Sequence, residues 1–408
     1  MKILCVLGQH NYGDPDRGEG YEYSNFLPAL RRQGHEVTHF ESFARDDYLD
    51  FADLNRRLLD AVQAEGPDVI LCVLLGYEIW LETLDLIRSG SQSILINWST
   101  DDSWKYEQFS RYMARPFHIY ATTYPDAVSK SLKDKYSNFV LTQWAANAER
   151  LIEPLPANEC SRPVSFVGSM YGNRRQWIAA LRERGIEVEC FGHGSDGGAV
   201  SLEQMQRIIR ESVISLNFSD SGLVMQGATL GRSRQLKARV FEVSGAGGFV
   251  MTEHAENLEN FFVPGREIVV FNGIDELVGL IRFFLEHHKE RDAIAWAGYR
   301  RTQDEHTYDA RFRHLLALAA QIRAENRDAT ARCEIDFAQF DALRRAHFVH
   351  FPLKLLKWLL QLPCILLWGR IRGPRAARRI LFEISWRVAG VKTYTASGWP
   401  GRLFYRES

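Results

Sequence analysis

The chain alternates short, almost wholly apolar runs with longer windows in which apolar residues recur every three or four positions. The runs predict strands and the windows predict helices. In the first 150 residues we expect strands at 2–7, 36–40, 69–75, 93–98, 118–122 and 138–143, separated by helices such as 21–33 and 49–64. Continuous apolar strands alternating with helices are typical of a parallel sheet covered on both faces. Residues 1–150 are therefore predicted to form a doubly wound, Rossmann-like α/β domain.

Residues 151–162, LIEPLPANECSR, interrupt this alternation with two prolines and no periodicity, which predicts a linker. The alternation then resumes, with strands expected at 164–167, 188–191, 213–217, 249–252 and 268–271 and helices at 175–184, 201–211, 235–243, 276–287, 290–301 and 308–326. We expect a second Rossmann-like domain at 163–326, and the two domains to face each other across a cleft.

Composition supports a globular protein of two domains, with 408 residues, 46% hydrophobic and 25% charged. A net charge of −1 argues against a nucleic-acid partner. The six cysteines are scattered and the N-terminus enters a strand directly, so we expect reduced thiols, no signal peptide and a cytoplasmic location.

The charge is unevenly distributed, because residues 346–408 hold 11 Lys and Arg against 2 Asp and Glu. Residues 327–408 are predicted to form a basic, amphipathic α-helical extension. The run FPLKLLKWLLQLPCILLWG is apolar with two lysines and two tryptophans, which favours a helix lying in the plane of an anionic membrane surface. We therefore expect contact through 346–408 and a peripheral location at the inner face of the cell membrane. The alternative is that the extension packs as ordinary core.

Several common enzyme signatures are missing. Residues 8–13 read GQHNYG, which is no G-x-G-x-x-G fingerprint, and the P-loop, G-x-S-x-G and H-E-x-x-H motifs are absent. Dehydrogenases, P-loop NTPases, α/β-hydrolases and zinc proteases are disfavoured.

Two segments of the second half can bind an anion. The first, FVGSMYGNRR, is a strand that ends in a glycine loop containing Gly168 and is followed by a helix. Backbone N–H groups at such a helix start favour an anion, and Arg174 can clamp one; the alternative is a plain turn with a solvated arginine. The second contains Lys237, Arg239 and Glu242 before the Gly245–Gly248 turn, which we expect at the carboxyl edge of the sheet. The alternative there is a surface ion pair.

Four segments, in this order, resemble one known family. They are SFVGSMYGNRR, ARVFEVSGAGGFVMTE, REIVVFNGIDELVGLIRFFLEHHKERDAIAWAG and DEHTYDARF. Together they are similar to the C-terminal domain of GT-B glycosyltransferases of the "glycosyl transferases group 1" type, and most similar to its CgeB-like (spore maturation protein-like) branch. The N-terminal half resembles the family more loosely, at 34–37 and 98–102.

The resemblance implies a donor site. It implies that Glu242 hydrogen-bonds the ribose of a nucleotide sugar, that Arg174 and Arg239 face the diphosphate, and that the turn at Gly245 lets the backbone approach it. Many relatives carry a second glutamate eight positions before Glu242, where this chain has Arg234. Gly168 and Lys237 complete the expected donor-binding set. In this architecture cationic side chains neutralise the leaving diphosphate, so we expect neither a cofactor nor a metal site.

The acceptor side is expected in the first domain, at the ends of its strands. His10 and Asp101 are candidates for a base that takes the proton of an acceptor hydroxyl in an inverting reaction. Simple loop capping is the alternative for both, and a retaining enzyme of this architecture needs no such base.

These inferences predict a metal-independent, hexosyltransferase-like enzyme that moves a sugar from a nucleoside-diphosphate donor to an unknown acceptor. A lipid-linked acceptor or an envelope polysaccharide would suit a membrane-bound extension. The alternatives are a non-catalytic CgeB-like nucleotide-sugar-binding or maturation protein and a GT-B-type nucleotide-sugar epimerase.

Overall fold

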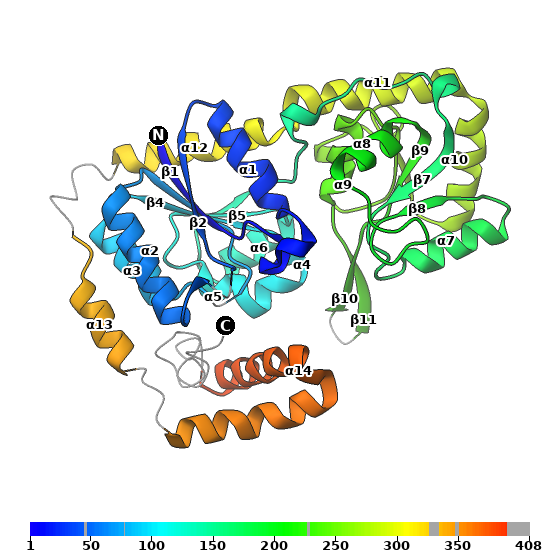
Figure 1. The fold of residues 1–408 in the computed structure, drawn as a ribbon. Coiled ribbons are helices and arrows are strands. Elements are labelled where there is room, and N and C mark those ends of the chain that lie inside the picture. Colours follow the sequence, from blue (N-terminus) through cyan, green and yellow to red (C-terminus); the bar gives the residue numbers. More distant parts are fainter. Residues whose placement is uncertain (45–46, 77, 227–228, 326–333, 347–350, 390–408) are drawn as a thin grey trace. The chain divides into compact units, whose positions relative to one another are not determined.

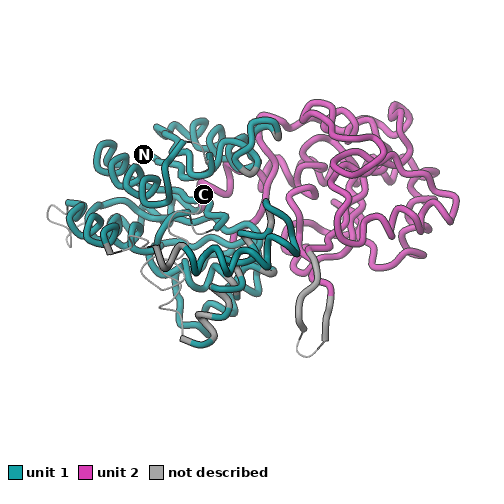
Figure 2. Tube along the Cα trace, turned by 60° about the horizontal axis from the view of Figure 1, so that its bottom comes forward, with its two compact units in different colours: residues 1–141, 315–408 teal, residues 142–314 magenta. Residues whose placement is uncertain are grey.

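A computed structural model describes residues 1–44, 47–76, 78–226, 229–325, 334–346 and 351–389 of the chain. It forms two compact units (Figure 2): unit 1 holds residues 1–141 and 315–408, and unit 2 holds 142–314. Each unit contains a parallel sheet with helices, so the predicted pair of Rossmann-like α/β domains is confirmed. The parts of the predicted extension at 327–333, 347–350 and 390–408 lie outside the described residues.

Unit 1 contains a six-stranded sheet in the order β2-β1-β3-β4-β5-β6, with every neighbouring pair parallel (Figure 1). Its strands are β1 (Lys2–Leu7), β2 (Glu36–Glu41), β3 (Val69–Cys72), β4 (Ile94–Ser99), β5 (Ile119–Thr122) and β6 (Phe139–Leu141). Its helices are α1 (Tyr21–Arg32), α2 (Phe51–Glu65), α3 (Leu81–Gly90), α4 (Asp102–Lys105), a π-helix (Tyr106–Ser110), α5 (Arg111–Met113) and α6 (Pro125–Lys133), and the later α13 (Phe337–Ala346) and α14 (Phe351–Ala389) also belong to this unit.

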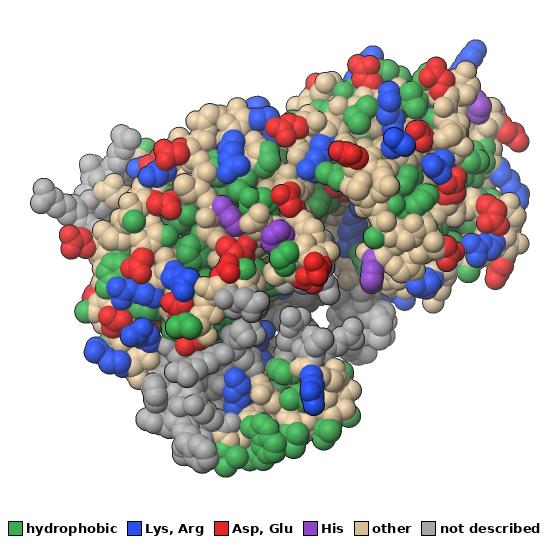
Figure 3. All heavy atoms as spheres, in the orientation of Figure 1, with side chains coloured by type: hydrophobic (Ala, Val, Ile, Leu, Met, Phe, Trp, Pro, Cys, Tyr) green, Lys and Arg blue, Asp and Glu red, His purple; other side chains and the backbone are tan. Residues whose placement is uncertain are grey.

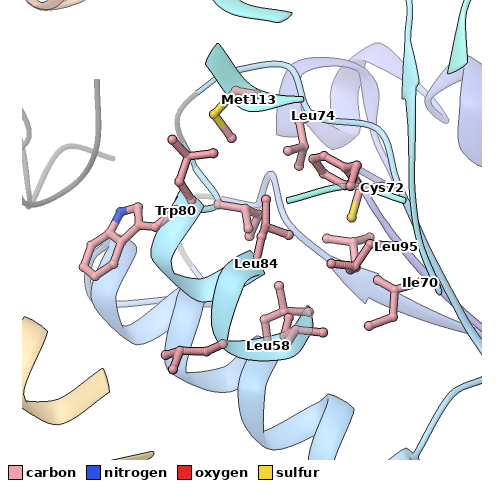
Figure 4. Close-up of a cluster of buried hydrophobic side chains, with 14 of the residues drawn as sticks. Leu58, Ile70, Cys72, Leu74, Trp80, Leu84, Leu95 and Met113 are labelled. Carbon is pink, nitrogen blue, oxygen red and sulfur yellow. The ribbon is translucent and has the colours of Figure 1, made fainter. Parts of the chain in front are cut away.

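The main core of unit 1 joins the sheet to helices α2 and α3 (Figure 4). Leu58 and Leu84 project from these helices toward Ile70 of β3 and Leu95 of β4, and all four side chains are buried. The helices form there because their apolar residues recur at helical spacing and so cover one face of the sheet.

A segment far along the chain packs on this first unit. Phe340 of α13 is fully buried, and its ring lies 6.0 Å from that of Trp80. Asp341 pairs with Arg56 of α2 at 3.3 Å. The predicted boundary, which placed 327–408 in a separate extension and ended the second domain at 326, is therefore wrong. Local periodicity identifies a helix but not the surface on which it packs.

Unit 2 contains a five-stranded parallel sheet in the order β13-β12-β9-β7-β8. Its strands are β7 (Arg162–Val167), β8 (Glu189–Phe191), β9 (Ser212–Asn217), β12 (Val250–Glu253) and β13 (Val269–Phe271). Its helices are α7 (Arg174–Glu183), α8 (Leu202–Arg210), α9 (Ala238–Gly245), α10 (Ile274–Glu286) and α11 (His288–Glu305), and α12 (Tyr308–Glu325) begins in this unit. The antiparallel strands β10 (Asp220–Gln226) and β11 (Thr229–Arg234) form a separate ribbon that the sequence pattern did not predict.

The expected linker at 151–162 is an integral part of unit 2. The Ile152 N–H donates to the carbonyl oxygen of Gly245 at 2.9 Å. The Ala157 N–H donates to the Asp292 carboxylate at 3.0 Å, and the buried Arg291 donates to the carbonyl oxygen of Leu155 at 2.8 Å. The segment lacks periodicity because it follows the surface of one unit, and the chain passes between units at 141–142 and 314–315.

Candidate functional site

The strand order of unit 2 defines the place where a ligand is expected. The chain runs from β7 to β8 on one side of β7, and from β9 to β12 on the other. β7 and β9 are neighbours, so their carboxyl ends flank the point where the winding direction changes. In open parallel sheets ligands bind outside the carboxyl ends of strands at such a point. The loops that follow β7 and β9 are therefore the candidate site.

The loop after β7 is held against the chain that follows β9. The buried carboxylate of Asp220 accepts a hydrogen bond from the Asn173 N–H at 3.1 Å. Gly172 has a φ of +63°, and an added Cβ would lie 2.2 Å from the same carboxylate. Gly168 begins the loop and donates its N–H to Phe191 at 2.8 Å. A glycine at position 172 is required because both the backbone conformation and the space exclude a side chain.

Arg174, at the start of α7, is only 6% exposed. Its guanidinium donates to the Ser169 carbonyl oxygen at 2.7 Å and to the Tyr171 hydroxyl at 3.0 Å, and lies 4.0 Å from the centre of that ring. Burial lowers the pKa of Arg174, and the nearby charge of Arg239 lowers it further. A solvated arginine in a plain turn is thus the wrong interpretation, since Arg174 shapes the loop from within. Its contact with a diphosphate stays a prediction.

Two arginines of β11 stand at the base of the ribbon, each on a buried acid. Arg232 pairs with Asp220 at 2.6 Å, and Arg234 pairs with Glu253 at 3.0 Å. The side chains of Asp220 and Glu253 are only 1% and 2% exposed, whereas those of Arg232 and Arg234 are 40% and 43% exposed. One edge of each guanidinium is therefore fixed by the protein while the rest faces solvent.

Helix α9 brings two further cationic groups to this region. Its N-cap is Lys237, and Arg239 pairs with Glu242 at 3.1 Å while also contacting the sulfur of Met205. The side chains of Arg239 and Glu242 are 25% and 17% exposed, so this is a half-buried pair and not a fully exposed surface pair. Their contacts with a nucleotide stay a prediction, as does that of Lys237.

The placement of Gly245 corrects the sequence interpretation. The turn joins the end of α9 to the start of β12, so it lies at the amino edge of the sheet and not at the expected carboxyl edge. An added Cβ at Gly245 would lie 2.8 Å from the Cβ of Ala146 and 3.1 Å from Leu151. Gly245 is needed for this packing within unit 2, and we do not retain it in the donor site.

The geometry as a whole suits an anionic ligand with two or more charges. Arg232, Arg234 and Arg239 offer partly exposed guanidinium groups, and the N-terminus of α7 directs its N–H groups to the same edge. Sequence reasoning missed Arg232 and its anchor Asp220, together with the Glu253 that anchors Arg234. The available signal was that Asp220 and Glu253 each follow the end of a predicted strand.

Unit 1 holds the two acceptor-side candidates. His10 follows β1, and its Nδ1 is buried without a hydrogen-bond partner among the described residues. Asp101 follows β4 as the N-cap residue of α4, and its carboxylate accepts from Thr100 at 3.5 Å. β3 lies between β1 and β4, so the two candidates follow strands that are not neighbours. Their catalytic roles stay predictions.

Sequence reasoning also missed a group of buried charges in unit 1. Lys105 is 5% exposed and donates to the Leu74 carbonyl oxygen at 3.0 Å. Burial lowers the pKa of Lys105, while the nearby Glu78 and Asp101 carboxylates oppose that change. Burial raises the pKa of Glu22, and the charge of Asp101 raises it further. The charge of Asp101 therefore acts on both Lys105 and Glu22.

Asp102, beside Asp101, has a structural environment. Its carboxylate accepts hydrogen bonds from the hydroxyls of Ser99 at 2.8 Å and of Ser110 and Thr122 at 2.5 Å. These contacts link the end of β4 to the π-helix and to β5. Across the described ranges, no three His, Cys, Asp or Glu side chains are grouped as a metal site would require.

Comparison with known proteins agrees with this architecture. Residues 174–317 match a family model described as glycosyl transferase-like. No curated protein matches the chain. Among solved structures, sucrose-phosphate synthase from Thermosynechococcus elongatus has a TM-score of 0.55 at 12% identity, over 80% of this chain and 100% of that one.

Two further structures share the fold. Anabaena Alr3699/HepE in complex with UDP and glucose has a TM-score of 0.52 at 12% identity, over 79% of this chain and 100% of that one. The lipopolysaccharide outer core galactosyltransferase WaaB, in its apo form, has a TM-score of 0.50 at 13% identity, over 78% of this chain and 99% of that one. The chain therefore has the GT-B fold, and residues 174–317 are similar to the glycosyl transferase-like family model.

Proposed function

We propose that this protein is a hexosyltransferase of the CgeB-like branch, which transfers a sugar from a nucleoside-diphosphate donor to an acceptor hydroxyl. The observation that carries the proposal is the cationic edge of unit 2, where Arg232 and Arg234 are anchored on buried acids beside the β7–β9 switch point. Guanidinium groups fixed in this way suit a diphosphate, which offers oxygens for paired hydrogen bonds.

In the proposed reaction, the bond between the sugar and the diphosphate breaks and negative charge accumulates on the departing group. Arg232, Arg234 and Arg239 would stabilise this charge, because a partly desolvated guanidinium is positioned before the reaction begins. Glu242 would accept a hydrogen bond from the ribose. We propose that these cations make a divalent metal unnecessary.

The acceptor would bind to unit 1, where His10 or Asp101 would take the proton of the attacking hydroxyl if the reaction inverts the anomeric centre. His10 has a buried ring nitrogen available, and Asp101 lies within electrostatic range of Lys105 and Glu22. As the acceptor we propose a lipid-linked sugar or an envelope polysaccharide at the inner face of the cell membrane, on account of the basic segment 346–408.

The first experiment measures nucleotide binding by calorimetry, using UDP because HepE, a structure of the same fold, was solved with UDP. Arg234→Gln and Arg239→Gln should each weaken binding by about 1.5–3 kcal/mol, which is roughly a 10- to 150-fold rise in Kd. Arg182→Gln is the matched control, because Arg182 is an exposed arginine in the last turn of α7, away from this edge. Equal affinities in all three folded variants would remove the donor site from unit 2.

The second experiment separates the competing functions. Incubation of the protein with UDP-sugars should release UDP slowly in the presence of EDTA if the protein is a metal-independent transferase. Conversion of the nucleotide sugar into an isomer without UDP release would identify an epimerase. Tight binding with neither product, over a panel of sugars and bases, would favour a non-catalytic binding protein.

A further inference from the structure

Helix α14 is divided in two by Gly369, whose φ of 78° and ψ of 173° are not helical. The first arm (351–368) and the second arm (370–389) form what we call the α14 hairpin, and Figure 1 shows the second arm returning beside the first. The backbones come close next to the turn, since an added Cβ at Gly373 would lie 2.5 Å from the Cα of Ile365. None of the helices in the described parts of the chain has the length and apolar character needed to cross a bilayer.

The α14 hairpin exposes an unusual share of apolar surface. Eleven of the twenty large hydrophobic side chains that are exposed in the described residues lie between 355 and 388. The apolar side chains form a continuous patch along the lower part of Figure 3. In the other described parts of the chain such side chains are scattered singly, which is normal for a globular protein. A contiguous apolar patch instead marks an interaction surface.

Three of the exposed leucines of the first arm share one face. Leu355, Leu359 and Leu366 are spaced i, i+4 and i+11, which places them within about 40° of one another around a helix. Cys364 is buried and lies on the opposite side, so the apolar face points away from the hairpin's own interior. This face is therefore not buried by the packing of one arm on the other.

The turn of the hairpin combines apolar tips with positive charge. Leu366 and Leu367 are 78% and 73% exposed, and Trp368 is 48% exposed. Arg370 follows at once and is also exposed. Tryptophan and arginine beside exposed leucines are typical of segments at a membrane–water interface, where the leucines enter the acyl region and the arginine meets the headgroups.

Charge decides which partner fits this surface. The segment 346–408 carries a charge of +9, from 11 basic and 2 acidic residues, while the remaining 345 residues carry −10. A second copy of the hairpin would bring two strongly positive segments together, which is unfavourable. An anionic bilayer offers both an apolar layer and the opposite charge.

We propose that the α14 hairpin lies in the surface of an anionic phospholipid bilayer, with the leucine face of its first arm in the acyl region. Binding localised to this hairpin would hold the chain at the membrane without a spanning helix. The proposal does not rest on glycosyl transfer, because it concerns a surface outside the donor site and is tested without substrates.

The test is co-flotation of the full-length protein with vesicles of phosphatidylcholine alone or of equimolar phosphatidylcholine and phosphatidylglycerol. We expect binding at least 10-fold stronger to the anionic vesicles, reduced by salt. Leu359→Gln combined with Leu366→Gln should abolish co-flotation, since it removes apolar contact without changing charge. The matched control is Leu49→Gln combined with Leu132→Gln, two leucines that are 90% and 65% exposed outside the hairpin. This control should bind as the wild type does.

A second variant tests the role of charge. Arg370→Gln should weaken binding to anionic vesicles but not the residual binding to neutral ones. Failure of the wild type to float with anionic vesicles at low salt would overturn the proposal. So would equal flotation of both leucine pairs. Light scattering that shows a dimer in the wild type and a monomer in Leu359→Gln/Leu366→Gln would replace it with self-association through this face.

Discussion

Replacing Arg291 by methionine tests how unit 2 is held together. Arg291 lies in α11 and its side chain is completely buried. Its guanidinium donates to the carbonyl oxygens of Val213 at 2.8 Å, Ser212 at 2.9 Å and Leu155 at 2.8 Å. One side chain thereby joins helix α11, the start of β9 and the segment at 151–162.

The expected loss of stability follows from these contacts. Methionine has a similar length and can fill the space beside the ring of Phe249, which the guanidinium faces at 5.7 Å. It donates no hydrogen bond, so up to three buried carbonyl oxygens lose a charged donor, at about 1–3 kcal/mol each. Removal of the buried charge offsets part of this penalty. We therefore expect unfolding to become easier by about 3–5 kcal/mol.

Urea unfolding followed by tryptophan fluorescence is a suitable assay. Arg300→Met serves as the control, because Arg300 lies on the same helix and is exposed over the ring of Trp296. We expect the control to change stability by less than about 0.5 kcal/mol. A difference below about 1 kcal/mol between the two variants would refute the view that Arg291 holds residues 151–162 in unit 2.

Three further predictions concern other contacts. Burial lowers the pKa of His306 to about 4, below its unfolded value near 6.5, so its contribution to stability is complete above pH 6.5 and is lost as pH falls toward 4. Between pH 6.5 and pH 4 the free energy of unfolding should therefore fall by up to about 3 kcal/mol less in His306→Gln than in the wild type. Equal changes in the two proteins would contradict a lowered pKa of His306. Gly172→Ala should weaken UDP binding and lower stability by more than about 1 kcal/mol, because a Cβ there meets Asp220; unchanged binding would exclude a role for this loop. Phe340→Ala should lower the stability of unit 1 by about 3–5 kcal/mol, because the ring is fully buried against Trp80; a negligible effect would show that α13 does not belong to this unit.

Much of the candidate site could be anticipated from local pattern. The predicted strand at 164–167 and helix at 175–184 placed Gly168 and Arg174 in a loop between them, and the structure has β7 and α7 there. A loop that follows a strand of a parallel sheet must lie at the carboxyl edge, so this inference needed no tertiary information. The error at Gly245 came from the same rule misapplied, since a loop that precedes a strand lies at the amino edge.

The rest of the site depended on contacts that local pattern does not encode. The ribbon β10–β11 has short strands interrupted by glycines, and its sequence lacks the alternation that identifies a strand. The anchoring of Arg232 on Asp220 requires the two strands to pair in one register, in which Asp220 lies opposite Arg234 and Arg232 comes two residues before that position. The ion pairs with Asp220 and Glu253 hold Arg232 and Arg234 in place at the switch point, and neither pair can be read from local sequence.

The sequence by itself therefore determined the two parallel α/β sheets and the position of the loop at 168–173, because the periodicity of apolar residues dictates which segments become strands and helices. The tertiary structure alone decided that residues 334–346 return to the first unit, that 151–162 belong to the second, and that Asp220 and Glu253 hold the arginines of β11. The contact of Phe340 with Trp80 shows the reason. Periodicity records which face of a segment is apolar, whereas the partner that covers this face is chosen by packing between residues far apart in the chain.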